Sequence, residues 1–90
     1  MRITVTTASQ TLRELLTVSQ YNDIQRTKEG VSISYAFLVI SGSVFMETNG
    51  IPATVANGYP ITEIVVDETT IKHVSLISSL GSADVRLIAF

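Results

Sequence analysis

The sequence predicts a mainly β protein: a small antiparallel β-sandwich or jelly-roll-like barrel with one short helix near the N-terminus. Short runs rich in β-branched and aromatic residues recur along the chain, at a spacing of roughly 8–12 residues that is typical of such folds. Gly, Pro, Asn and Ser gather in the turns between these runs. Strands do not alternate with helices, as a parallel sheet would require. We therefore expect a single β-rich domain over residues 1–90.

The N-terminal segment predicts a strand followed by a helix. Successive β-branched residues predict the first strand at Ile3–Thr6. The helix is expected to begin at Thr11, because Thr11 and Glu14 have the Thr-x-x-Glu spacing of a capping box. Three leucines then share one helical face, and Asn22-Asp23 is the expected end. The pattern predicts no other helix.

The longest expected strand is Val31–Ile40. Its odd positions form one continuous apolar face. Its even positions begin with serines and become apolar at Ala36, Leu38 and Ile40. One face is therefore expected to be core throughout, and the other is expected to be covered only in its later half.

The remaining strands are shorter. The longest strand is expected to form a hairpin with Val44–Thr48 through a Ser-Gly-Ser turn, and Asn49-Gly50 is a strong signal for the next hairpin turn. A proline makes Ile51–Val55 an edge strand or a very short one. Further strands are expected at Ile61–Val66, Ile71–Ile77 and Asp84–Phe90.

The composition indicates self-association. Charged residues are 16% and hydrophobic residues 46% of the chain, whereas an average soluble domain has about 25% charged residues. A small domain has much surface for its volume, so this surplus of apolar side chains needs a partner surface. Cysteine is absent, which excludes stabilisation by disulfides or thiolate-bound metals. We expect a homo-oligomer; the alternative is a monomer with an efficient core and a Ser/Thr-rich surface.

Several classes of partner are not expected. The net charge is −2 and the six Lys and Arg residues are scattered, whereas a nucleic-acid surface gathers positive charge on one face. The longest apolar run, Ala36–Ile40, is far shorter than the ~20 residues of a membrane-spanning helix. The first residues alternate like a strand and do not resemble a signal peptide. We expect no nucleic acid, no membrane, and synthesis in a cytoplasm.

The sequence contains no recognisable catalytic motif. Glu63, Asp67 and Glu68 form the one local group of carboxylates, and two of them lie in an expected turn, where solvated acids are ordinary. His73 lies in an expected strand, and no Gly-x-Ser-x-Gly motif supplies a nucleophile for it. A Gly-rich phosphate loop is also absent. We therefore expect no enzyme activity, no cofactor and no metal site.

The candidate contact residues are apolar and lie in or near expected turns, where they would otherwise meet water. They are Ile51, Pro52, Tyr59, Pro60 and Leu80, together with Phe90. The alternative is that these loops fold back and cap the core. Tyr59 is also the ring best placed for carbohydrate binding, although sugar sites usually need exposed aromatic rings beside polar groups and the chain has no Trp.

Four segments carry a resemblance to known proteins: Ile3–Thr7, Thr11–Leu16, Val74–Ser78 and Ser82–Ile88. Together they resemble the small virion structural proteins of tailed bacteriophages, especially capsid decoration (cement) proteins. The resemblance implies a compact sandwich or jelly-roll-like domain, often a homotrimer, that sits on the capsid surface and clamps neighbouring subunits of the major capsid protein. Two alternatives stay open: another virion part, such as a tail or head–tail connector component, or a small carbohydrate- or host-surface-binding module.

Overall fold

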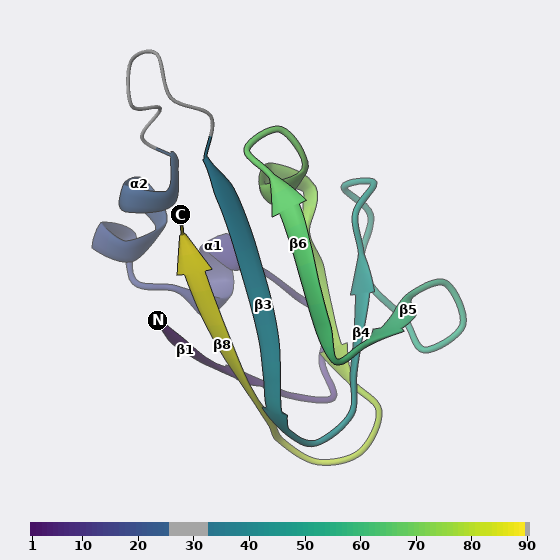
Figure 1. The fold of residues 1–90 in the computed structure, drawn as a ribbon. Helices are drawn as coiled ribbons and strands as arrows, with labels where there is room; N and C mark the ends of the chain where they lie inside the picture. Colours follow the sequence, from purple (N-terminus) through teal and green to yellow (C-terminus); the bar gives the residue numbers. More distant parts are fainter. Residues whose placement is uncertain (26–32, 90) are drawn as a thin grey trace.

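The computed structural model describes residues 1–25 and 33–89, which form two four-stranded antiparallel sheets and three short helices (Figure 1). Sheet A has the strand order β1 (Arg2–Val5), β8 (Ala83–Ala89), β3 (Ser34–Ser41) and β6 (Glu63–Asp67). Sheet B has the order β2 (Gln10–Thr11), β7 (Ser75–Ser78), β4 (Val44–Glu47) and β5 (Tyr59–Ile61). The helices are α1 (Leu12–Leu15), α2 (Val18–Gln25) and the 3₁₀ helix η1 (Thr70–His73).

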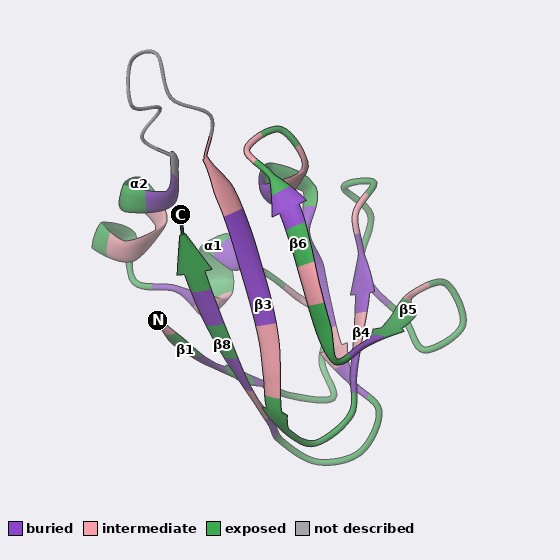
Figure 2. Ribbon diagram, in the orientation of Figure 1, coloured by how far each residue is buried: buried purple, intermediate pink, exposed green. Residues whose placement is uncertain are grey.

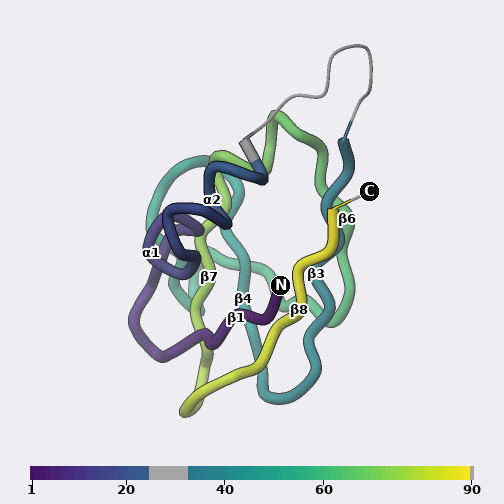
Figure 3. The backbone as a smooth tube through the Cα atoms, turned by 90° about the vertical axis from the view of Figure 1, so that its left-hand side faces the viewer, coloured from purple at the N-terminus to yellow at the C-terminus, as the bar shows by residue number. Residues whose placement is uncertain are grey.

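The strand order is that of a jelly roll. β1 pairs with β8, β2 with β7, β3 with β6 and β4 with β5, so the chain follows one long folded hairpin. Two further pairings, β3 with β8 and β4 with β7, roll this hairpin into two sheets. Figure 3 shows the two layers from the side, with β3, β6 and β8 in one and β4 and β7 in the other. The expected antiparallel sandwich of jelly-roll type is confirmed.

The hydrophobic core lies between the two sheets. In sheet A, Phe37 of β3 lies opposite Leu87 of β8 and Ile64 of β6. In sheet B, Met46 lies opposite Leu76, and both are fully buried. Buried and exposed residues alternate along β1 and β8, as Figure 2 shows, because successive side chains of a strand point to opposite faces.

The two faces of β3 differ more than the sequence predicts. Tyr35 and Phe37 are buried on the core side, as expected. On the other side Ala36 is buried and Leu38 half-buried, but Ile40 is 56% exposed. The expectation that the later half of this strand is covered on both sides is therefore confirmed at Ala36, met in part at Leu38 and wrong at Ile40. Leu12, Leu16 and Ile24 of the helical segment pack into the core between the sheets, so the helices leave the end of this face open to solvent.

Two helices stand where the sequence predicts one. The Glu14 carboxylate accepts hydrogen bonds from the backbone N–H (3.0 Å) and the hydroxyl (3.1 Å) of Thr11, which confirms the expected start of α1. Leu16 then adopts an extended conformation and ends this helix. A second capping box follows at once: Gln20 accepts the N–H of Thr17 (3.0 Å), and the Thr17 hydroxyl accepts the N–H of Gln20 (3.2 Å). This second box starts α2.

The helices close one side of the sandwich. Leu12, Leu16 and Ile24 are buried and belong to the same apolar cluster as the inner faces of the sheets. The Tyr35 hydroxyl of β3 donates a hydrogen bond to the carbonyl oxygen of Ile24. This bond fastens the end of α2 to sheet A.

Two short connections carry the chain from one sheet to the other. β3 lies in sheet A and β4 in sheet B, so the expected hairpin through Ser41–Ser43 is wrong. Gly42 has a φ of +87°, and a Cβ at this position would lie 2.7 Å from the Cβ of Ala83. The expected strand Ile61–Val66 is likewise divided at Thr62, between β5 in sheet B and β6 in sheet A.

The segment expected to form a strand at Ile51–Val55 is a loop. Residues 48–58, here called the 48–58 loop, separate β4 from β5, so Asn49-Gly50 does not close a two-residue hairpin. Asn57 fixes the loop, because its Oδ1 accepts the N–H of Thr54 (2.6 Å) and its own N–H binds the Thr54 hydroxyl (3.0 Å). These side-chain bonds compete with strand pairing.

The expected strand Ile71–Ile77 begins as the helix η1, and only Ser75–Ser78 pairs in sheet B. The Asp67 carboxylate accepts the N–H of Thr70 (2.6 Å) and so closes the turn before η1. The last strand, β8, occupies nearly the expected range.

Candidate interaction surfaces

Four of the six candidate contact residues belong to one continuous segment. Ile51 and Pro52 lie in the 48–58 loop, and Tyr59 and Pro60 lie in the strand β5, not in the expected turn. The side chains of Ile51 and Tyr59 are 50% and 41% exposed, and both prolines are exposed. The segment 48–61 therefore presents apolar groups to solvent.

The other two candidates are separate from this segment. Leu80 lies in the loop between β7 and β8, and its side chain is 85% exposed. This loop runs beside the turn after β3, because the N–H of Ser79 donates to the carbonyl oxygen of Ser43 (3.1 Å). Figure 1 shows both connections together at the lower end of the sandwich, away from β5. Phe90 lies outside the described residues.

The backbone of the 48–58 loop is held against the outer face of sheet B. Ala53 is buried, and the Ser75 hydroxyl donates to the carbonyl oxygen of Ile51 (2.9 Å). The Glu47 carboxylate, buried beneath the loop, accepts the N–H of Asn49. The loop thus folds back over the sheet and still holds its larger apolar side chains outward. Of the two alternatives for these residues, a contact surface and a loop that folds back, each describes part of the 48–58 loop.

A second apolar surface is the outer face of sheet A, which was not among the candidate sites. In one row across this face, here called the apolar row, Ala36 of β3 lies between Ile88 of β8 and Val65 of β6. The Val65 side chain is 55% exposed, and Ile40 extends the same face along β3. The sequence showed the apolar positions of β3, but only the register between strands shows that β6 and β8 widen them into a surface.

The neighbouring row of this face carries opposite charges. In this charged row, Leu38 of β3 lies between Arg86 of β8 and Glu63 of β6. Both charged side chains are exposed, and neither forms an ion pair with another residue in the described ranges. At the β1 side, Arg2 pairs with Asp84. Arg86 and Glu63 therefore remain available to charges on another molecule.

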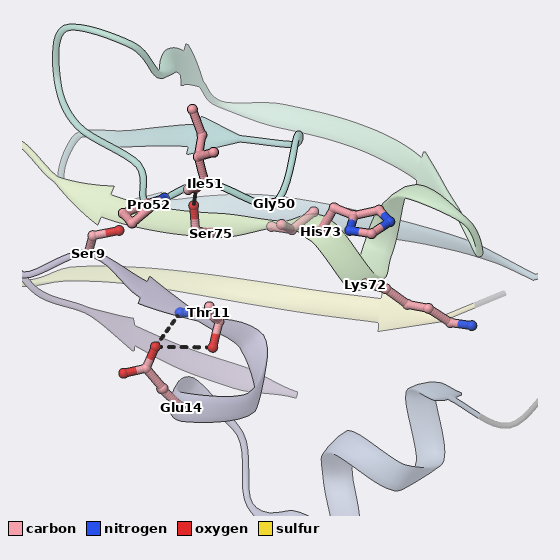
Figure 4. A pocket seen from close by; sticks show the side chains of 10 residues that line it. Ser9, Thr11, Glu14, Gly50, Ile51, Pro52, Lys72, His73 and Ser75 are labelled. Carbon is pink, nitrogen blue, oxygen red and sulfur yellow. Dashed lines mark hydrogen bonds between the residues drawn. The ribbon is translucent and has the colours of Figure 1, made fainter.

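A small cleft lies between α1, the 48–58 loop and η1. Its volume is about 240 Å³, and its walls include Glu14, His73 and Ser75 (Figure 4). Typical small-molecule sites are larger, at about 300–1,000 Å³. Glu14 and His73 stand on opposite walls, and the Glu14 carboxylate already binds Thr11 in the capping box. The cleft therefore does not assemble a general acid–base pair.

The carboxylates singled out in the sequence do not come together as a site. Glu63 and Asp67 lie at opposite ends of β6. Hydrogen bonds from the backbone N–H and then the hydroxyl of Thr70 lower the pKa of Asp67, which identifies it as a turn-stabilising carboxylate. In residues 1–25 and 33–89, no three His, Asp or Glu side chains are close enough together to hold a metal ion.

Comparisons with protein-family models, with curated proteins and with solved structures found no match. In the described part of the chain, no helix has both the length and the apolar character needed to cross a bilayer. The fold, the exposed apolar surfaces and the resemblance of the sequence are the features that bear on function.

Proposed function

We propose that this protein is a non-enzymatic structural subunit of a tailed-bacteriophage particle that decorates the capsid and stabilises the head by bridging subunits of the major capsid protein. The observation that carries the proposal is the exposure of large apolar side chains on separate surfaces of one small domain. These surfaces are the segment 48–61, the loop that carries Leu80 and the outer face of sheet A.

Separate surfaces suit a bridging role. A protein that clamps two neighbours must contact both at once, and it does so without a deep pocket. Each contact can be modest, because attachment to a symmetric shell multiplies contacts through avidity. We assign the contact with coat subunits to the exposed side chains of Ile51, Tyr59 and Leu80, with Pro52 and Pro60 beside them.

The jelly-roll topology is compatible with a capsid-binding role but is not specific to it. Jelly rolls occur in viral capsid proteins, and also in lectin domains and cupins. Because one fold hosts many functions, the strand order supports the proposal only together with the exposed surfaces and the resemblance to virion proteins.

The test is to purify virus particles that carry this gene on a density gradient and to count the chain by quantitative mass spectrometry. A fixed ratio to the major capsid protein is expected in heads separated from tails. The double variant Ile51→Ser/Leu80→Ser should lower that ratio, whereas Val18→Ser, on the exposed face of α2, should not. Absence of the chain from washed heads would refute the proposal, and its presence in tails alone would favour a tail component.

A second candidate function is carbohydrate binding, favoured by one observation. The Tyr59 ring is partly exposed on β5, an edge strand, beside the exposed Pro60. An exposed ring can stack on a sugar face. A glycan array with the wild-type protein and Tyr59→Ala tests this function: binding that the substitution abolishes would support the module, and an array without signal would reject it.

A further inference from the structure

The outer face of sheet A is complementary to itself. Its charged row places a positive and a negative side chain on either side of Leu38, and neither has an ion-pair partner in the described chain. We infer that this face binds a second copy of the same chain, face to face, around a two-fold axis that runs along β3. The inference concerns self-association, and it holds whether or not the protein sits on a capsid.

The strand register shows why the pattern is self-complementary. A two-fold rotation about an axis parallel to β3, midway between two facing sheets, keeps the strand direction and exchanges the two sides of each sheet. β8 of one copy then faces β6 of the other. Arg86 of each copy meets Glu63 of the other, Ile88 meets Val65, and Leu38 meets its own copy. The interface therefore holds two ion pairs beside a continuous apolar strip, the geometry of an isologous contact.

The other two-fold arrangement of two facing sheets is unfavourable. An axis across the strands, centred on the charged row, places Arg86 against Arg86 and Glu63 against Glu63. If that axis is moved by half a row spacing toward the apolar row, each charge faces an aliphatic side chain. If it is moved the other way, Arg86 faces Asp84, which already pairs with Arg2, and Glu63 is left without a charged partner. Like charges in contact or charges without a partner penalise all three arrangements. The charge pattern therefore selects the axis along β3.

The size of the face sets the expected strength of the contact. With strands ~4.8 Å apart and ~3.3 Å per residue, the apolar and charged rows with Ile40 cover roughly 15 Å by 15 Å. That is well below the ~800 Å² per partner of a standard interface. We therefore expect a weak, reversible dimer that forms only at high protein concentration.

Sedimentation equilibrium of the isolated protein over a range of concentrations tests the inference. The weight-average mass should rise from the 9.8 kDa of one chain toward twice that value and stop there. A mass that stays at one chain up to millimolar concentration, or that rises to three chains as the resemblance to trimeric proteins implies, would overturn the inference.

A charge exchange tests the geometry. Arg86→Glu and Glu63→Arg should each weaken the homodimer by at least about tenfold, because like charges then face each other twice. The double variant Arg86→Glu/Glu63→Arg should restore an affinity close to wild type. An equimolar mixture of the two single variants should form a heterodimer, because every facing pair again has opposite signs. Failure of both the double variant and the mixture to recover dimers would overturn the axis along β3.

Substitutions of two similarly exposed valines test whether the contact is specific to this face. Val65 lies on the outer face of sheet A and Val55 in the 48–58 loop, and their side chains are almost equally exposed, at 55% and 51%. Val65→Ser should weaken dimerisation about tenfold, and Val55→Ser should leave it unchanged. Equal effects of the two substitutions would contradict the assignment of this face. Thermal unfolding at low concentration checks that both variants fold.

Crosslinking provides a second readout of the same axis. The chain has no native cysteine, so a single introduced thiol reports one position. Leu38→Cys, close to the axis, should be joined to its own copy by a short bismaleimide, and Val55→Cys should not. The reverse pattern would overturn the inference even if dimers form.

Discussion

Gly42 shows how a single residue determines the passage between the two sheets. Its φ is positive, and a Cβ would collide with Ala83 at the start of β8. Gly42→Ala is therefore expected to lower the free energy of unfolding by about 2–4 kcal/mol, through a strained backbone and overpacking together. Urea denaturation measures this loss. Gly81→Ala is the control, because Gly81 also has a positive φ but its Cβ would meet nothing within 4 Å, so only about 1 kcal/mol should be lost. Equal losses would show that the contact with Ala83 is unimportant.

Tyr35 makes the stability of the fold depend on pH in the alkaline range. Burial, with a smaller contribution from Glu68, raises the pKa of Tyr35 above its usual 10.0. The folded state therefore favours the neutral phenol, which donates its hydrogen bond to Ile24. This contribution is complete below the usual pKa and is lost as the pH rises through the raised one. We expect the unfolding free energy of the wild type to fall more steeply above about pH 10 than that of Tyr35→Phe. Denaturation series at several pH values measure both slopes, and parallel profiles would contradict the expectation.

The start of α2 depends on the second capping box. Thr17→Ala removes the hydroxyl that accepts the N–H of Gln20, and it should lower the unfolding free energy by about 1 kcal/mol. Ser19→Ala, at the second residue of the same helix, should leave stability unchanged or raise it slightly, because alanine has the higher helix propensity. Thermal unfolding monitored by circular dichroism compares the two variants. A loss of the same size in both would show that the Thr17 hydroxyl has no special role at the start of the helix.

Local signals in the sequence predict most elements and miss how they connect. The capping box at Thr11 and the apolar face of β3 could be read directly, because each depends on neighbouring residues. The second box, Thr17 with Gln20, has the same three-residue spacing and could have been predicted by the same rule. In contrast, no local pattern tells whether a turn returns the chain to the same sheet or carries it to the other one. The chain changes sheets at Gly42 and Thr62, and both connections were predicted wrongly for this reason.

The candidate sites divide in the same way. Exposed apolar residues in turn-like segments, such as Ile51 and Leu80, could be proposed from composition and position alone. The outer face of sheet A could not, because it is assembled from three strands that lie far apart in the sequence. Its charged row appears only when the register between β3, β6 and β8 is known.

At the scale of the whole molecule, the folded hairpin joins the two ends of the chain. The amino group of Met1 donates to the carbonyl oxygen of Leu87, 86 positions away. Because such distant contacts must close large loops before they stabilise anything, we expect refolding in milliseconds to seconds, as for other β-sandwiches. Stopped-flow dilution from urea at low micromolar concentration measures the rate. A relaxation completed within microseconds would show that local structure dominates the transition state.

The 48–58 loop makes the two broad faces of the molecule different. It covers part of the outer face of sheet B, whereas the outer face of sheet A is open to solvent. A domain that self-associates only through the outer face of sheet A can bind one other copy, because that face is then covered in both. At the edges of sheet B, lateral growth is also restrained, because the strands β2 and β5 are only two and three residues long and present few free backbone groups for pairing with another chain. The same asymmetry that permits face-to-face pairing through sheet A therefore limits that contact to two copies.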